Sequence, residues 1–340
     1  MNFDDLLREQ IEQLDLQNPE NGPLIKQVLE YWASIKDTGI NNQLLQELVL
    51  KYSASEKKLK QLNEELLDKQ KRLDADLAAA AEIQKSLLPH KIDSTANLSI
   101  AWKFMPCEHT GGDIFDMFQL DDDHWALYML DVSGHGVQAA MITVSVAQFL
   151  QPNSGHLLEP NSGGLAALLQ IRTPAEVLTA LDDEFPFERF NNFFTITYMT
   201  INTRTGELRY SNAGHPHSIL LRKDGPLEHL SKGGPAIGMG DFRLLSGQAE
   251  RFEEGYLQLN PGDKLFVYTD GIVEYQKPGG EFYGSEHLCE TLQAMPGKSI
   301  NDMIEQAIKS LLNFGDHTKP QDDITILGLE FRGVDPKAER

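Results

Sequence analysis

The feature that most constrains how this chain folds is a set of aspartates placed where apolar, strand-like segments end or begin. Asp131 follows the segment Trp125–Leu130, and Asp270 follows Lys264–Tyr268. Asp322 precedes the segment Ile324–Leu329. A fourth acid, Asp113, follows Gly111 and Gly112. Taken alone, each aspartate fits a turn or a helix cap. Because unpaired carboxylates are costly to bury, four of them in similar contexts favour a shared cation.

Asp131 has the sequence context most typical of a cation ligand. A glycine-rich turn, Gly134-His135-Gly136, follows it, and then a helix-like run, Val137–Leu150. Glycines let the backbone approach an ion closely and offer carbonyl oxygens as ligands. Ligands that are all oxygen favour Mg²⁺ or Mn²⁺ over Zn²⁺. Two such ions can bridge a water, lower its pKa and clamp a phosphoryl group, so the pattern predicts phosphoryl chemistry.

Beyond Pro89 the sequence alternates strand-like segments with glycine-rich turns. The predicted strands include Leu98–Phe104, Asn192–Ile201, Leu208–Asn212, Ser218–Leu221, Leu257–Leu259, Lys264–Tyr268 and Ile324–Leu329. The predicted helices are Val137–Leu150, Pro174–Phe185, Ser285–Met295 and Ser299–Phe314. Many antiparallel strands with a few long helices indicate an α+β domain. The polar segment Gln151–Gly164 is expected to be an exposed insertion, and the tail at residues 333–340 to be disordered.

Before Pro89 the sequence is helical in character. Short helices are expected at Asn2–Leu16 and Leu24–Ile35, and a long one from Asn42 to Leu88, where Pro89 ends it. The long helix has a heptad row: Tyr52, Leu59, Leu66, Leu73, Ala80 and Leu87. Its second row is broken by Lys69 and Asp76. The pattern favours a parallel dimeric coiled coil, and the alternative is a single amphipathic helix packed on its own domain.

These changes in pattern predict four regions along the chain. Residues 1–50 are expected to form an N-terminal helical input and dimerisation region, and residues 51–88 a coiled-coil-like linker helix. Residues 89–332 form the predicted catalytic domain, and residues 333–340 the tail.

The composition of the chain limits which binding partners and which cellular location are expected. The formal net charge of −21 repels nucleic acid and anionic membranes, so neither is an expected partner. Two distant cysteines, Cys107 and Cys289, predict neither a disulfide framework nor a short-spaced metal pair. The acidic N-terminus does not read as a signal peptide, and no apolar run approaches the length of a membrane span. A cytoplasmic location is expected.

An ordered set of motifs gives the chain its resemblance to a known family. The motifs are Ile83–Pro89 (IQKSLLP), Gly111–Asp116 (GGDIFD), Asp131–Met141 (DVSGHGVQAAM), Asn192–Thr195, Asn212–His217 (NAGHPH), Gly234–Gly238, Tyr268–Glu274 (YTDGIVE), Phe282–Gly284 and Gln321–Leu327 (QDDITIL). In this order they resemble the PPM family, the metal-dependent type 2C protein serine/threonine phosphatases. The most similar branch is the bacterial one of sporulation stage II E and stress-regulator phosphatases, which acts in sigma-factor control.

The resemblance implies a fold and a metal centre. The implied fold is an α-β-β-α sandwich of two antiparallel sheets flanked by helices, with two Mn²⁺ or Mg²⁺ ions at one edge. By motif, Asp131 would bridge both ions and the Val132 carbonyl would add a ligand. Asp113 would bind on one side, and Asp270 and Asp322 on the other. These four aspartates are the implied catalytic residues, because a metal-bridging water would attack phosphorus without a protein nucleophile.

Several residues near the motifs have open roles. Asp116 and Asp323 are candidates for an outer shell or a third ion. His135 is either a general acid or a residue that shapes its loop, and the structural role is favoured, as it is for His215.

Two further roles concern the segment just before Gly111. The resemblance leaves open whether His109 approaches the ions. Eukaryotic relatives hold the phosphate with an arginine near the first strand. None occurs between Leu88 and Gly111, which leaves Lys103, a metal ion or the substrate itself to make that contact.

The resemblance also implies a substrate and a mode of control. The substrate would be a small phosphorylated anti-sigma-factor antagonist. The N-terminal helical region would control activity through the linker helix, and it is the candidate binding site of a regulatory partner. Two alternatives stay open: a catalytically inactive phosphatase-fold scaffold, and a phosphatase of small molecules. Retention of all four acids disfavours the inactive scaffold.

Overall fold

The computed structural model describes residues 42–89, 94–107, 111–134, 136–160, 169–239 and 251–333. The chain divides into two compact units, Met1–Ala75 and Asp76–Arg340. The helices expected at residues 2–16 and 24–35 lie outside the described residues, as do His109, His135 and the tail after residue 333. None of the helices in the described ranges combines the length and hydropathy that a membrane span requires.

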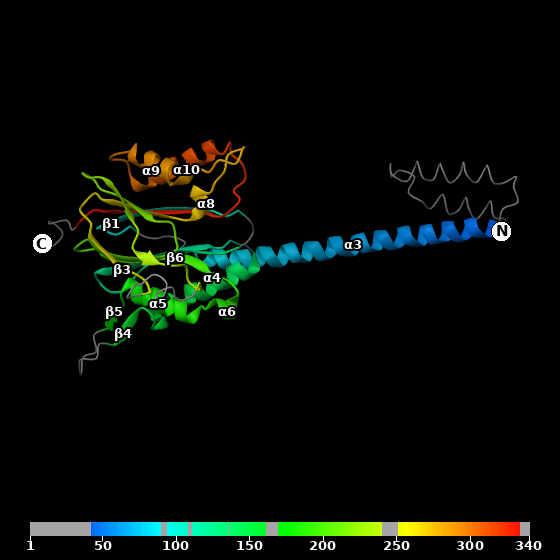
Figure 1. Ribbon diagram of the computed structural model, residues 1–340, viewed down its shortest axis with the longest axis horizontal. Coiled ribbons are helices and arrows are strands. Elements are labelled where there is room, and N and C mark those ends of the chain that lie inside the picture. The colour runs from blue at the N-terminus through cyan, green and yellow to red at the C-terminus, as the bar shows by residue number, and fades with distance from the viewer. Residues whose placement is uncertain are drawn as a thin grey trace. The chain divides into compact units, whose positions relative to one another are not determined.

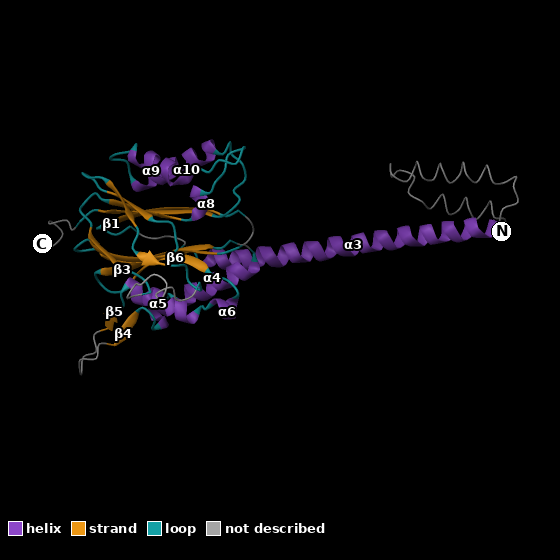
Figure 2. Cartoon of the chain, in the orientation of Figure 1, coloured by secondary structure: helices purple, strands orange, loops and turns teal. Residues whose placement is uncertain are grey.

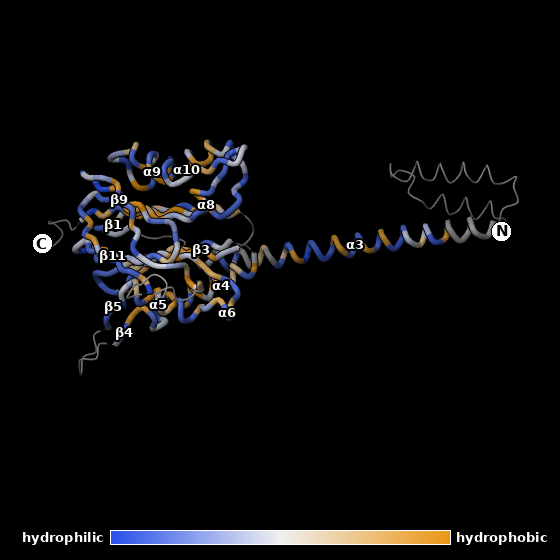
Figure 3. The backbone as a smooth tube through the Cα atoms, viewed as in Figure 1, coloured by the Kyte–Doolittle hydropathy of each residue, from blue (hydrophilic) through white to orange (hydrophobic). Residues whose placement is uncertain are grey.

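The first described element is a single long helix, α3 (Asn42–Leu87), as predicted. Its sequence contains neither glycine nor proline, and Pro89 follows two residues after its end. The helix carries apolar side chains that are left exposed in the structure. They are Leu50, Tyr52, Leu59, Leu62, Leu66, Leu67 and Leu73. Figure 3 shows the resulting alternation of apolar and polar residues along α3.

The second unit is built on two facing β-sheets (Figures 1 and 2). The first sheet has the order β1 (Leu98–Met105), β13 (Ile324–Phe331), β12 (Lys264–Tyr268), β8 (Ser218–Leu221), β9 (Leu227–Leu230). The second has the order β10 (Gly233–Gly234), β7 (Glu207–Ala213), β6 (Phe194–Asn202), β3 (His124–Val132), β2 (Asp113–Gln119), with β11 (Gly255–Gln258) also paired to β7. All pairings are antiparallel except the two-residue contact of β10 with β7.

Helices cover the outer face of each sheet (Figure 1). On the first sheet lie α9 (Gly284–Gln293) and α10 (Ile300–Phe314), and on the second α4 (Val137–Phe149) and α5 (Pro174–Glu184). Capping residues set where two of them begin: Thr173 forms a capping box with Glu176, and Ser299 accepts from the Asp302 amide. The predicted α-β-β-α sandwich is therefore confirmed.

Strand β12 shows why the core has more than one layer. All five of its residues are buried. Leu265 and Val267 belong to the core cluster that includes the sandwich interior, whereas Phe266 and Tyr268 belong to the cluster beneath α9 and α10. Since successive side chains point to opposite faces of a strand, a strand covered on both sides reads as a continuous apolar run.

Two parts of the domain differ from the sequence-based expectation. Within Gln151–Gly164, expected to be an exposed insertion, Leu157 is fully buried and β4 (Leu158–Pro160) pairs with β5 (Leu169–Ile171). One apolar side chain thus anchors a segment whose composition is otherwise polar. Strand β9 was not predicted, and it forms by pairing with β8 across the turn at residues 222–226.

Candidate metal centre

Two of the predicted ligands meet through the register of neighbouring strands. In the pairing of β2 with β3, Asp113 lies directly opposite Asp131. Side chains at directly opposed positions of an antiparallel pair lie on the same face and close together. Two carboxylates that are 18 positions apart in sequence are thereby placed side by side at one end of the second sheet.

The two glycines before Asp113 are required by close packing. A Cβ on Gly112 would lie 2.6 Å from the Val132 carbonyl oxygen and 3.0 Å from Oδ1 of Asp131. A Cβ on Gly111 would overlap the Asp323 carboxylate, at 1.6 Å from Oδ2. The absence of side chains at these positions lets backbone reach the acids, which is the role expected of glycine at such a site.

The first sheet brings its acids to the same edge. Asp270 is the first residue of a short helix, α8 (Asp270–Val273), directly after β12, and Asp322 and Asp323 directly precede β13. Because β12 and β13 are antiparallel, the end of one lies beside the start of the other, and the Thr269 amide donates to the Thr325 carbonyl at 3.1 Å. The antiparallel pairing therefore gathers all three acids.

Asp113 connects the two sheets. Its Oδ2 accepts a hydrogen bond from the Thr269 hydroxyl at 2.8 Å and another from the Thr325 hydroxyl. Both threonines belong to the first sheet's side of the site, whereas Asp113 starts a strand of the second. The side chain is 2% exposed, so these two donors offset the cost of burying its carboxylate.

The acids repel one another strongly. Burial, and then the charges of Asp270 and Asp322, raise the pKa of Asp131 to about 8. Burial and the charges of Asp322 and Glu274 raise the pKa of Asp270 to about 6. Burial, and then the charges of Asp131 and Asp323, raise the pKa of Asp113 well above the ordinary aspartate value.

Such a cluster fits divalent cations. Within the described residues, none of the groups that shift these three pKa values carries a positive charge. Cations would supply the missing counter-charge, and a carboxylate-rich donor set with a nearby backbone carbonyl suits Mg²⁺ or Mn²⁺. The residues present therefore fit the ions that the sequence implies.

The two neighbouring acids before β13 differ in environment. Asp322 is exposed, and its Oδ1 accepts from the Asp323 amide at 2.7 Å. Asp323 is 1% exposed and accepts from the Cys107 amide at 2.9 Å. Cys107, Asp322 and Asp323 together form a group whose ligand atoms lie within 4.8 Å of one another.

Two more of the singled-out residues are separate from the acid cluster. Asp116 lies opposite Tyr128 in the β2–β3 register, and burial is the main cause of its raised pKa. Since it is three positions after Asp113 on a strand, it points to the other face. Lys103 is exposed on β1.

His215 is buried in the turn that follows β7, where a structural role was expected for it. Its Nδ1 lies 2.8 Å from the Thr195 hydroxyl, and its backbone amide donates to the Asn212 side chain at 2.8 Å. Burial lowers its pKa to about 3, so the ring is neutral at ordinary pH. Thr195 is the cross-strand partner of Asp131, which places this turn directly behind the site.

Sequence reasoning missed the residues that support the acids. Besides Thr269 and Thr325, these include Gln84 on α3, whose Nε2 donates to the Gly111 carbonyl at 2.6 Å and whose Oε1 accepts from the Gly111 amide at 3.2 Å. Glu274 adds negative charge near Asp131 and Asp270. All four lie inside the quoted motifs, so motif membership was the available signal.

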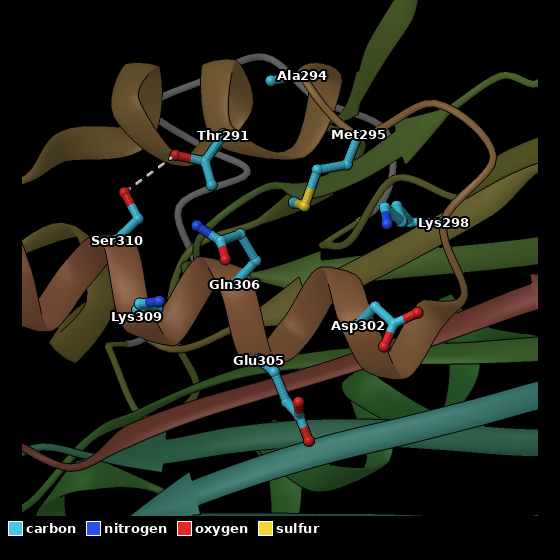
Figure 4. Close-up of a pocket in the computed structure, with 9 residues that line it drawn as sticks. All are labelled: Thr291, Ala294, Met295, Lys298, Asp302, Glu305, Gln306, Lys309 and Ser310. Atoms are coloured by element: carbon cyan, nitrogen blue, oxygen red, sulfur yellow. Dashed lines mark hydrogen bonds between the residues drawn. The ribbon is translucent and has the colours of Figure 1, made fainter.

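A groove elsewhere on the domain is separate from this centre. It lies between α9 and α10, has a volume of about 820 Å³, and is lined by residues that include Met295, Lys298 and Lys309 (Figure 4). None of the predicted ligands lines it. The acid cluster at the strand ends is therefore the better candidate for chemistry.

Metal-free protein should lose thermal stability as the pH rises from about 5 to about 8.5. The pKa values of Asp270 and Asp131 in the folded state, about 6 and about 8, lie above the ordinary value of the unfolded chain. The folded state thus binds more protons in this window, and its relative stability falls as they leave. Scanning fluorimetry in EDTA measures the melting temperature at each pH.

In Asp131→Asn, the melting temperature should fall less over the same pH range. The reason is that one of the two carboxyl groups with a raised pKa has been removed. Asp224→Asn is the matched control, since Asp224 lies exposed in the turn between β8 and β9. An Asp131→Asn protein with the same pH slope as wild type would contradict the electrostatic description.

Comparisons with known proteins show the family to which the chain belongs. A profile of the stage II sporulation protein E (SpoIIE) family matches residues 121–332. The chain is 28% identical over 273 residues to protein IcfG of Synechocystis sp., covering 75% of this chain and 41% of that protein. It is 26% identical over 259 residues to the phosphoserine phosphatase RsbP of Bacillus subtilis, covering 74% of this chain and 57% of that protein. The chain thus spans about half the length of these two relatives.

A solved structure shows the same fold. The SiaA-PP2C domain of Pseudomonas aeruginosa matches with a TM-score of 0.61 and 21% identity, covering 77% of this chain and 98% of that domain. At this level of identity the match establishes the PP2C-type fold alone. Because the family profile covers more than half of the sequence, the chain belongs to the SpoIIE family.

Proposed function

We propose that this chain is a metal-dependent protein phosphatase that removes phosphate from phosphoserine or phosphothreonine. The observation that carries the proposal is the meeting of carboxylates from both sheets around Asp131, whose pKa is raised by burial and then by the charges of Asp270 and Asp322. Family membership and the printed activity of the relative RsbP, a phosphoserine phosphatase, support the same reaction.

The proposed metal ligands are Asp113, Asp131, Asp270, Asp322 and the Val132 carbonyl. Two Mn²⁺ or Mg²⁺ ions held there would neutralise phosphoryl oxygens and lower the pKa of a water. The chain's own contribution is to hold the acids in position. Thr269 and Thr325 fix the orientation of Asp113, and Gly111 and Gly112 keep side chains out of the space beside Asp131 and Asp323.

Removal of a proposed ligand should abolish turnover. Asp131→Asn and Asp270→Asn are each expected to lower kcat/KM on a phosphoserine peptide by more than about a hundredfold, because less negative charge remains to hold the ions. EDTA should have the same effect on wild type, and added Mn²⁺ should reverse it. Phosphate release by a colorimetric assay measures the rates.

Asp224→Asn again serves as the control, since it removes a carboxylate from an exposed turn of the same domain. It should keep wild-type rates. Full activity in either Asp131→Asn or Asp270→Asn would reject the assignment of the site.

We further propose that the N-terminal helical region controls this activity through α3. The support is the pair of hydrogen bonds by which Gln84, a buried residue in the last turns of α3, holds the Gly111 peptide. Gly111 contacts Asp323 and lies two residues before Asp113, so a shift of α3 would be passed directly to the acids. The physiological substrate would be a phosphorylated anti-sigma-factor antagonist, in keeping with the family branch.

Gln84→Ala should weaken metal activation. With both hydrogen bonds lost, we expect the Mn²⁺ concentration for half-maximal activity to rise about tenfold, as is typical when support of a metal site is removed. Gln70→Ala, on an exposed position of the same helix, is the matched control. Titration of activity with Mn²⁺ measures the effect, and unchanged activation in Gln84→Ala would contradict this route of control.

We propose that two copies of the chain form a parallel homodimer through α3, because one row of apolar side chains on this helix is exposed. Tyr52, Leu59, Leu66 and Leu73 recur every seven residues and are 44–62% exposed in the single chain. Pairing with a second copy would remove these side chains from water, which is the driving force of a coiled coil.

Leu59→Glu combined with Leu66→Glu should convert the protein to a monomer, because charges would be buried in the seam. Lys57→Glu combined with Lys71→Glu changes charge at positions that point away from the seam and should leave the dimer intact. Light scattering after gel filtration gives the mass. A monomeric wild type would refute the pairing.

A further inference from the structure

Asn192 lies just before β6, and its side chain holds the loop that follows Asp131. Its Nδ2 donates to the Ser133 carbonyl at 3.1 Å, and its Oδ1 accepts from the Ser133 hydroxyl. The same Oδ1 accepts from the Phe193 amide at 2.8 Å. Both polar atoms of the Asn192 carboxamide are therefore hydrogen-bonded, and Ser133 is a partner of each.

These contacts extend the pairing of β3 with β6 by one residue. The last pair in the register is Val132 with Phe194, and beyond it the Ser133 amide donates to the Phe193 carbonyl at 3.0 Å. A hydrogen-bonded antiparallel pair normally exchanges two such bonds. Here the Asn192 carboxamide takes the place of the second bond, because it accepts from the Phe193 amide and donates to the Ser133 carbonyl.

The peptide unit that is held in this way carries the Val132 carbonyl, one of the proposed metal ligands. The unit is planar and trans, so this carbonyl points away from the Ser133 amide. Since the amide points to Phe193, the carbonyl oxygen lies on the β2 side, where a Cβ on Gly112 would be 2.6 Å from it. Oδ1 of Asp131 lies 3.0 Å from the same point. The hold on Ser133 thus sets the direction of a carbonyl beside the Asp131 carboxylate.

Other contacts of this segment are weaker within the described residues. The Val132 amide donates to the Gly112 carbonyl at 3.3 Å, which is longer than usual for such a bond. A Cβ on Gly134 or Gly136 would meet no atom within 4 Å apart from its chain neighbours, so neither position is packed against the domain. The Asn192 side chain is therefore a main restraint on the backbone that follows Asp131.

We infer that Asn192 is a positioning residue of the metal centre, whose carboxamide fixes Ser133 and thereby the direction of the Val132 carbonyl. The inference rests on the proposed function and adds a residue that supports its metal site. Groups that orient metal ligands typically change metal affinity by about ten- to a hundredfold. Without the carboxamide, the carboxylates stay on their strands, but the carbonyl is no longer held beside them.

Asn192→Ala tests this role through direct binding of Mn²⁺ to the full chain. Electron paramagnetic resonance measures free Mn²⁺ during a titration, and the concentration at half-saturation should rise about tenfold over wild type. Ser133→Ala loses the hydroxyl bond and keeps the bond to the Ser133 carbonyl, so its half-saturation concentration should rise only about threefold. Asn313→Ala is the matched control, since Asn313 is exposed on α10, and it should bind Mn²⁺ as wild type does.

Melting temperatures in EDTA separate this role from a purely structural one. A structural residue would lower the melting temperature of Asn192→Ala and leave Mn²⁺ half-saturation unchanged, and that result would overturn the inference. If Asn192→Ala does not fold, Ser133→Ala decides, because wild-type binding of Mn²⁺ in this variant would equally overturn it.

Turnover of a phosphoserine peptide by wild type tests the proposed function separately. A wild type that binds Mn²⁺ and releases no phosphate would refute the phosphatase, while the half-saturation ratio of Asn192→Ala to wild type would still decide the inference. A wild type that is active with Mn²⁺, together with a ratio near one, would overturn the inference alone. A wild type that binds no Mn²⁺ would overturn both.

Discussion

The hydrogen bonds of Asp113 to Thr269 and Thr325 are the interaction on which the candidate site depends. They join the start of a strand in one sheet to the adjoining ends of two strands in the other. Together with the Asp113 amide, which donates to Asp323 Oδ2 at 3.5 Å, they set the spacing between the acids of the two sheets, whereas strand register positions the acids only within each sheet. The sandwich therefore does more than bury a core: it aligns two strand ends across an interior that excludes water.

The same alignment destabilises the folded protein electrostatically. Carboxylates that raise one another's pKa values are unfavourable neighbours, and the glycines beside them remove the side chains that would otherwise keep them apart. Such a cost is typical of sites shaped for a ligand rather than for stability. Gln84 gives α3 a part in this arrangement. Its side chain is hydrogen-bonded to the backbone of Gly111, which packs against Asp323.

The strand ends were predictable because buried strands leave a strong signal. The continuous apolar run of Lys264–Tyr268 and the aspartate after it could be recognised without any knowledge of partners. Leu157 could not, because a single apolar residue in a polar segment carries no periodicity. Thr269 and Thr325 were also missed as supports, since a threonine in or just after a strand is ordinary until its hydroxyl is seen beside a buried carboxylate.

The order of residues alone specified most of the secondary structure, the helix that ends before Pro89 and the aspartates beside the buried strands, because these depend on local periodicity, breakers and residue type. The tertiary structure decided which acids meet. Asp113 and Asp131 are joined by strand register, Asp270 and Asp322 by antiparallel pairing, and the two sets by hydroxyl groups across the sandwich. Distances between residues far apart in sequence arise only when the sheets pack, so no local pattern contains them.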